Sequence, residues 1–163
     1  KSADKEVPFN GVYMLRHGKL TAEYKELSRP NGIALSPDEK KLYVVERKGT
    51  PSRSIWAYDI AADGSASNKT KLIDANGPGA LDGFKVDRDG NLWCGWGSDG
   101  RLGVNPADHD GVRVFNPQGK AIAHIHLPER CPNLTFGGPK GNRLYMASCH
   151  SLYALYVEAE GAA

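Results

Sequence analysis

The 163-residue sequence contains only three cysteines, and none of its apolar runs approaches the roughly 20 residues that a membrane-spanning helix needs. The net charge is +2 and both signs are spread along the chain, so no basic stripe is available for nucleic acid. Residues 1–10 are polar and lack the apolar centre of a secretory signal, although processing could have removed one. We therefore expect a soluble protein with no nucleic acid or membrane partner, and its compartment, cytoplasmic or periplasmic, stays open.

The cysteines are Cys94, Cys131 and Cys149, which are too few for a disulfide scaffold. Cys131 and Cys149 also lack the paired spacing of a zinc site. Two arrangements stay open for them. They form one bridge if the fold brings them together, or they remain free thiols.

Signals for long helices are equally scarce. The chain has 19 glycines and 10 prolines, and no segment keeps apolar residues at a helical period. Short runs rich in aromatic and β-branched residues, such as Leu42–Val45, Ile55–Tyr58 and Val112–Phe115, alternate instead with turn sequences such as Asp89-Gly-Asn. The sequence therefore predicts an all-β fold.

Three segments of the chain can be aligned with one another. They begin at Asn31, Asp82 and Asn133, so the interval is 51 residues in both cases. A fixed period of this size, filled by short strands and turns, is typical of β-propeller blades. Each aligned segment predicts the inner strand pair of a blade.

A second repeat follows the first and predicts the outer strand pair of each blade. It begins near Gly11, Ser54, Gly111 and Leu152. We therefore expect an outer pair at about residues 11–27, whole blades at about 30–74 and 80–128, and most of one more blade. Three to three and a half blades cannot close a ring, so residues 1–163 are expected to form the C-terminal part of a single propeller domain whose first blades are absent.

Equivalent strand starts of a propeller converge on its axis, so Asn31, Asp82 and Asn133 are expected to face one central site. Carboxylate and amide oxygens are hard ligands that suit Ca²⁺, Mg²⁺ or Mn²⁺. Such an ion can polarise a lactone carbonyl, with Asp82 serving as ligand and general base. The alternative is that these residues only cap turns ahead of strands.

The ends of the second inner strands return to the same level, because paired strands are antiparallel. Segments 46–53, 95–110 and 149–150 are therefore expected on the metal face, with 95–110 as a rim loop. The substrate-binding candidates in them are Trp96, which could stack on a sugar-like ring, and Arg47, Ser98 and His150 as hydrogen-bond donors. The alternative for each is an ordinary surface residue.

Two further patterns are set aside. His124 and His126 lie two apart on a predicted strand and could share a metal, but an outermost strand with a solvated polar face is the interpretation we favour. Residues 87–91, Asp-Arg-Asp-Gly-Asn, are similar to a calcium loop, but the glycine is misplaced and no closing glutamate follows. They predict a hairpin turn.

Four segments together resemble the gluconolactonase/regucalcin (senescence marker protein) family of six-bladed propeller lactonases. They are residues 29–44, 81–93, 111–120 and 135–139, and the resemblance runs from Pro8 to Val157. It implies that the chain corresponds to the second half of a six-bladed propeller. The family's metal ligands match Asn31 and Asp82 here, and a glutamate ligand from the first blade falls outside this sequence. Asn133 has no such match and stays a candidate pocket residue.

The resemblance implies a gluconolactonase-like hydrolase of sugar (aldono)lactones that uses one divalent metal ion, with calcium expected and zinc, manganese or magnesium as alternatives. Two other interpretations stay open: a non-catalytic propeller that binds calcium or a ligand, and a related hydrolase of other esters or phosphotriesters. The remaining blades would come from a companion chain, after a nick before Lys1, or from a second copy. We favour the companion chain.

Overall fold

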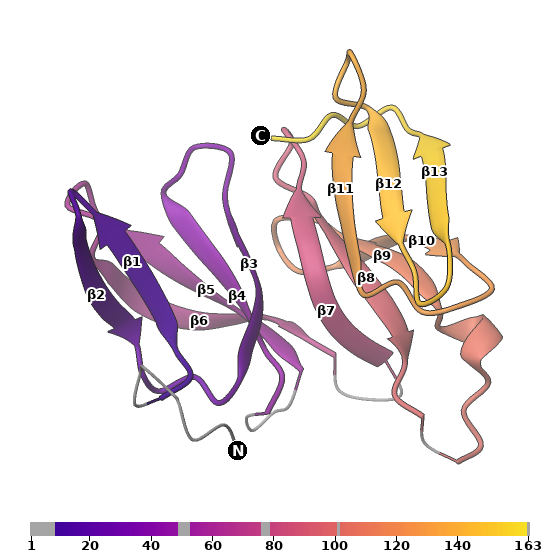
Figure 1. Cartoon of the computed structure of the whole chain (residues 1–163), viewed down its shortest axis with the longest axis horizontal. Coiled ribbons are helices and arrows are strands. Elements are labelled where there is room, and N and C mark those ends of the chain that lie inside the picture. The colour runs from indigo at the N-terminus through magenta and orange to yellow at the C-terminus, as the bar shows by residue number, and fades with distance from the viewer. Residues whose placement is uncertain (1–8, 49–52, 76–78, 101, 163) are drawn as a thin grey trace.

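The computed structural model describes residues 9–48, 53–75, 79–100 and 102–162, which form antiparallel sheets placed side by side (Figure 1). The first sheet pairs β1 (Val12–Arg16) with β2 (Lys19–Tyr24). The second contains, from its inner to its outer strand, β3 (Pro30–Leu35), β4 (Lys41–Glu46), β5 (Ser54–Ile60) and β6 (Ala66–Asp74). Its bounds confirm the blade predicted at residues 30–74.

The third sheet confirms the blade predicted at residues 80–128. It contains β7 (Gly79–Val86), β8 (Leu92–Ser98), β9 (Gly111–Phe115) and β10 (Ala121–His126). The fourth sheet contains β11 (Asn133–Gly137), β12 (Arg143–Ala147) and β13 (Leu152–Tyr156). Helical structure in the described residues is limited to the short 3₁₀ turn η1 (Pro106–Asp108), and none of it is long and apolar enough to cross a membrane. The all-β prediction is confirmed.

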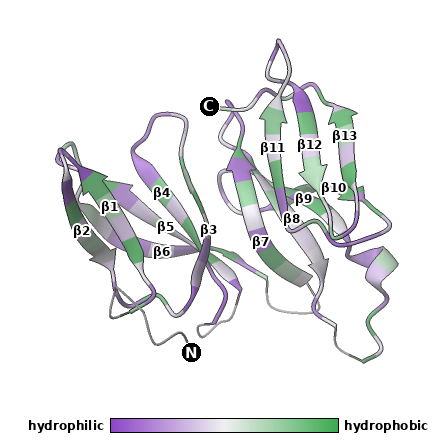
Figure 2. Cartoon of the chain, viewed as in Figure 1, coloured by the Kyte–Doolittle hydropathy of each residue, from purple (hydrophilic) through white to green (hydrophobic). Residues whose placement is uncertain are grey.

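The apolar core is divided into layers between successive sheets, and the hydropathy colouring shows the green stripes that alternate along the strands (Figure 2). Strand β4 illustrates the cause. Within β4, Tyr43 and Val45 belong to the cluster shared with the third sheet, whereas Leu42 and Val44 belong to the cluster shared with the first sheet. Successive side chains of a strand point to opposite faces, so one strand with both faces buried contributes to two cores.

The innermost strands β3, β7 and β11 lie next to one another, and glycine makes this approach sterically permissible. A Cβ atom on Gly32 would lie 2.5 Å from the carbonyl oxygen of Asp82 and 2.9 Å from a ring carbon of Phe84. A Cβ atom on Gly83 would collide with the side chain of Asn133. The glycines that follow Asn31 and Asp82 therefore set the spacing between neighbouring sheets.

Candidate functional site

Asn31 and Asp82 lie at irregularities in the pairing of their strands. The register shifts between Pro30 and Ile33 in β3, and between Leu81 and Phe84 in β7. A β-bulge of this kind re-aims side chains and is frequent next to active sites. Asn31 and Asp82 are the first residues, here called lead residues, of their aligned segments. Each of them, with the glycine that follows it, thus sits at a break in the ladder, facing the neighbouring sheet.

The two bulges bring Asn31 and Asp82 into direct contact. The side-chain amide Nδ2 of Asn31 donates a 2.6 Å hydrogen bond to Oδ1 of Asp82, across 51 residues of sequence. Both residues line a pocket of about 400 Å³, together with Lys85, Pro132 and Asn133. The structure therefore gathers the three aligned lead residues in one pocket.

Asn133 lies in this pocket with a different backbone geometry. It pairs with Ala147 in an unbroken ladder, and its Oδ1 accepts a 2.9 Å hydrogen bond from the backbone N–H of Leu134. That bond orients the oxygen toward its own strand. Asn133 thus forms part of the pocket wall beside Gly83. Unlike Asn31 and Asp82, it does not sit at a bulge.

A second, smaller pocket of about 90 Å³ shares Asp82 and Pro132 with the first. Its lining includes Arg47 and Trp96, which the sequence placed on the metal face as candidates, and also Arg130 and Cys149. Asp82 lines both pockets, and neither lining includes another acidic residue. As a whole residue, Asp82 is half-buried.

The prediction that residues 95–98 begin a rim loop is wrong, because β8 continues to Ser98. In the sequence Gly95 and Gly97 look like residues of a loop. In the structure both lie within the strand, where a side chain would have no room. A Cβ atom on Gly97 would lie 2.6 Å from Cγ of Arg130, and one on Gly95 would collide with the carbonyl oxygen of Cys131. These glycines admit the segment that leads into β11.

Trp96 and Ser98 are consequently buried strand residues. Trp96 is 4% exposed and packs against Phe115, with the Arg113 guanidinium 5.0 Å from the centre of its ring. The backbone N–H of Ser98 donates to Oδ1 of Asp110 at 2.7 Å. Stacking of Trp96 on a sugar ring and donation by Ser98 to a substrate stay predictions.

His150 is exposed and is held by Glu129. Both its backbone N–H, at 2.7 Å, and its ring Nδ1, at 2.9 Å, contact Oε2 of Glu129. This carboxylate also accepts from Tyr153. The structure thus places His150 in the loop between β12 and β13, outside the residues that line the two pockets around Asp82. Part of the predicted metal face, residues 49–52 and 101, lies outside the described residues.

The sequence reasoning missed Lys85 and Arg130. Lys85 follows Asp82 by three residues in β7, and Arg130 precedes Asn133 by three. A signal for Arg130 was available, because Arg29-Pro30-Asn31 and Arg130-Cys131-Pro132-Asn133 share an arginine and a proline ahead of the lead asparagine. The inserted Cys131 obscured this correspondence.

All three cysteines are free thiols in the structure. Cys131 and Cys149 both line the smaller pocket, which is the proximity that the bridge hypothesis required, but no bridge joins them. Burial raises the pKa of the Cys131 thiol to about 11. Burial also raises the pKa of Cys94 above its ordinary value.

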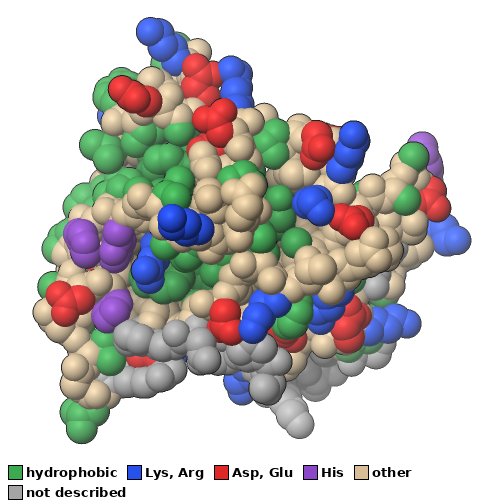
Figure 3. Space-filling view, turned by 180° about the vertical axis from the view of Figure 1, so that it is seen from behind, with side chains coloured by type: hydrophobic (Ala, Val, Ile, Leu, Met, Phe, Trp, Pro, Cys, Tyr) green, Lys and Arg blue, Asp and Glu red, His purple; other side chains and the backbone are tan. Residues whose placement is uncertain are grey.

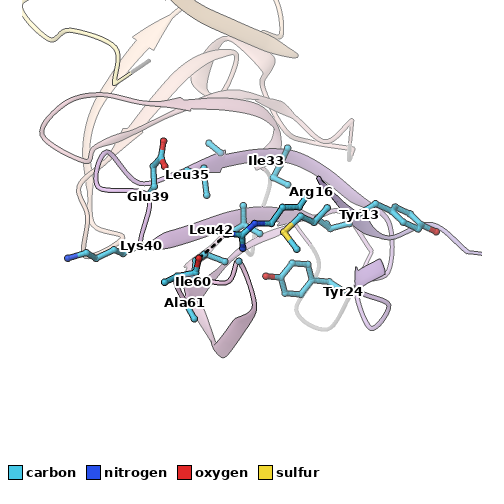
Figure 4. A pocket seen from close by; sticks show the side chains of 15 residues that line it. Tyr13, Arg16, Tyr24, Ile33, Leu35, Glu39, Lys40, Leu42, Ile60 and Ala61 are labelled. Carbon is cyan, nitrogen blue, oxygen red and sulfur yellow. Dashed lines mark hydrogen bonds between the residues drawn. The ribbon is translucent and has the colours of Figure 1, made fainter. Parts of the chain in front are cut away.

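Another cavity, of about 810 Å³, lies between the β1–β2 hairpin and the second sheet (Figure 4). Its walls are mostly apolar and include Met14, Tyr24, Ile33 and Leu42. Arg16 extends along it and donates to the carbonyl oxygen of Ala62 at 3.3 Å. The groove is lined mainly by apolar side chains and contains neither Asn31 nor Asp82, so the Asn31–Asp82 pocket stays the candidate site.

The Asn31–Asp82 pair fits a divalent cation in part. The contact between their side chains shows that one ion could reach both, and their amide and carboxylate oxygens are the donors that calcium prefers. Calcium takes six to eight oxygens, so water, substrate or other protein groups must supply the rest. Among the described residues, no group of three or more His, Cys, Asp or Glu side chains could hold a metal.

Comparison with known proteins gives a consistent result. The family model described as the SMP-30/Gluconolactonase/LRE-like region matches residues 1–150. A gluconolactonase from Zymomonas mobilis is 32% identical over 167 aligned positions, which cover 96% of this chain and 43% of that protein. The chain thus spans somewhat less than half the length of this relative.

Solved structures agree on the fold. A gluconolactonase from Xanthomonas campestris superposes with a TM-score of 0.77 at 33% identity, covering 94% of this chain and 46% of that one. Regucalcin from Agrobacterium tumefaciens, described as a calcium-binding protein, superposes with a TM-score of 0.76 at 24% identity, covering 93% of this chain and 53% of that one. The antiparallel sheets are therefore blades of the gluconolactonase and regucalcin type.

Proposed function

Because the chain belongs to the SMP-30/gluconolactonase/LRE-like family, we propose that it forms the part of a sugar-lactone hydrolase that carries Asn31 and Asp82 at the catalytic centre. The observation that supports this most is the contact of these two side chains, 2.6 Å apart across successive blades, in a pocket of about 400 Å³. The gluconolactonases of Zymomonas and Xanthomonas, at 32% and 33% identity, support an aldonolactone as the substrate.

In the proposed reaction the carboxylate of the half-buried Asp82 is the general base. It accepts a proton from the water whose oxygen attacks the lactone carbonyl carbon. The ring C–O bond then breaks, and the proton held by Asp82 passes to the departing ring oxygen, which becomes the hydroxyl of the aldonic acid. Proton transfer of this kind contributes typically about 10²- to 10⁴-fold to a rate.

Asn31 and Asp82 would also hold the divalent ion of the family. When bound, such an ion polarises the lactone carbonyl and lowers the pKa of water. Asn31 orients the Asp82 carboxylate through its hydrogen bond, and its amide oxygen supplies a neutral ligand. Calcium is the ion to test first, because both donors are hard oxygens and a regucalcin of the same fold is a calcium-binding protein.

Lys85 lines the larger of the two pockets that contain Asp82, and Arg130 lines the smaller one. Their positive charges would favour the negative charge that develops on the carbonyl oxygen and the carboxylate of the product. Arg47 lines the same pocket as Arg130. We assign these three residues to substrate binding and Asp82 to proton transfer.

The remaining blades complete the proposal. The chain spans 43% of the Zymomonas gluconolactonase, and the apolar groove between the β1–β2 hairpin and the second sheet leaves Ile33 49% and Leu35 43% exposed. We propose that additional blades, supplied by a companion chain or by a second copy, cover this groove and add ligands to the ion. The active unit would then contain more than the present chain alone.

The experiment is hydrolysis of glucono-δ-lactone by the purified protein, before and after chelation and with metals added back. We expect hydrolysis that chelation removes and calcium, or another divalent ion, restores. Asp82→Asn keeps the shape of the side chain but cannot act as a base, so it should lower kcat by about 10²-fold or more. Wild-type turnover by Asp82→Asn would contradict the assignment.

Two controls separate the outcomes. Asn133→Ala alters the pocket wall without touching the base, so it should retain most of kcat. A denaturing mass spectrum of the same sample reveals whether a companion chain is present. Metal binding without hydrolysis, in a sample that contains all blades, would instead establish a non-catalytic binding propeller.

A further inference from the structure

The outermost strand of the third sheet carries two histidines whose rings are in contact. His124 and His126 project from the same face of β10, with ring centroids 3.9 Å apart and planes inclined by 38°. The space-filling view shows histidine side chains gathered on this side of the molecule, bordered by hydrophobic side chains (Figure 3). The pair is distant in the sheet from Asp82, because β10 and β7 are its opposite edges.

The backbone contact of His126 determines which of its ring nitrogens carries the proton. Nδ1 of His126 lies 3.2 Å from the carbonyl oxygen of Ala107. A carbonyl can only accept, so Nδ1 carries the proton and Nε2 of the neutral ring is left with a lone pair. Metal-binding histidines are fixed in the same way, by donating their other ring nitrogen to a backbone carbonyl.

His124 provides a second, independent observation. Its Nε2 atom is buried and has no hydrogen-bond partner. A buried polar atom without a partner is destabilising and calls for an explanation, of which a bound ion is one. Burial, reinforced by His126 and Arg113, lowers the pKa of His124, so its ring is neutral near pH 7.

We propose that His124 and His126 form a binding site for a transition-metal ion such as Zn²⁺, Cu²⁺ or Ni²⁺, separate from the Asn31–Asp82 site. Imidazole nitrogens suit these ions, whereas calcium prefers oxygen. An ion about 2.0–2.1 Å from each nitrogen would hold the two nitrogens roughly 3–3.5 Å apart. This separation is of the same order as the 3.9 Å between the ring centroids. Water completes the coordination, because the described residues contain no cluster of three or more His, Cys, Asp or Glu side chains that could hold a metal.

The charges around the pair limit the affinity. Arg113 pairs with His124 across β9 and β10, and His109, between η1 and β9, also acts on His124. The Arg113 guanidinium is directed over the rings of Trp96 and Phe115, at 5.0 and 5.8 Å from their centres. Its positive charge nevertheless opposes a cation at His124, so a moderate affinity is expected for two ligands.

The test is titration of the chain with Cu²⁺ at pH 7.5, followed by calorimetry and by electron paramagnetic resonance for nitrogen coupling. We expect one ion with imidazole nitrogen coupling, and His124→Gln and His126→Gln should each weaken binding by at least about tenfold. Because protons compete for the same nitrogens, binding should also weaken between pH 7.5 and pH 5.5.

The matched control is His17→Asn, which removes an exposed histidine from the β1–β2 turn while keeping a residue that tolerates its positive φ of 49°. This variant should bind Cu²⁺ as the unaltered chain does. Circular dichroism establishes that each variant is folded. Unchanged binding in the His124→Gln/His126→Gln double variant, or unchanged binding at pH 5.5, would overturn the proposal.

Discussion

At the scale of single residues, the cysteines differ in reactivity although all three are free thiols. Cys149 is exposed, whereas burial raises the pKa of Cys131 to about 11. Only the thiolate reacts, and at pH 8 a thiol of that pKa is ionised in roughly one molecule in a thousand. Iodoacetamide at pH 8 should therefore modify Cys149 first, and Cys131 and Cys94 only after unfolding. Peptide mass spectrometry measures this, and equal labelling of Cys131 and Cys149 in the folded chain would contradict it.

At the scale of elements, the glycines after Asn31 and Asp82 determine how closely the innermost strands approach. Gly32→Ala would place a Cβ atom 2.5 Å from a backbone oxygen of β7, which cannot move aside as a flexible side chain could. We expect a loss of about 1–3 kcal/mol in the free energy of unfolding, measured in urea.

Gly137→Ala in β11 is the comparison for this variant. Its Cβ atom would meet only the ring of Tyr145, at 3.1 and 3.5 Å, so a clearly smaller loss is expected. If both variants unfold at the same urea concentration, then the close approach of β3 and β7 does not limit the stability of the sheet pair.

At the scale of the whole molecule, one ion shared by Asn31 and Asp82 would link the second sheet to the third. A ligand that binds only the folded state stabilises it by about 2.7 kcal/mol at 100 times its dissociation constant. Calcium should therefore raise the Tm of the chain, and excess chelator should reverse the rise. Asn31→Ala should reduce the rise by removing one ligand, with Asn133→Ala as the control. Equal rises in the unaltered chain and Asn31→Ala would place the calcium elsewhere.

The sequence predicted the sheets well, because the 51-residue interval and the strand pattern both arise from local structure. It predicted the convergence of Asn31 and Asp82 for the same reason. It wrongly placed residues 95–98 in a loop, because Gly95 and Gly97 are typical of loops, whereas both lie in β8 and leave room for residues 130–132. Contacts of this kind join distant segments, so a local pattern does not contain them. The bulges at Asn31 and Asp82, which aim the candidate ligands, were equally invisible.

The placement of each core layer between successive sheets has a consequence for synthesis on the ribosome. A sheet that has just emerged cannot cover its second face until the next sheet follows, about one 51-residue interval later. At roughly 5–20 residues per second, this interval lasts several seconds. During that time the nascent chain presents an uncovered apolar face, such as the one that Val45 and Ile55 form before β7 is complete. Each newly made blade thus passes through a period in which chaperones have a defined surface to protect.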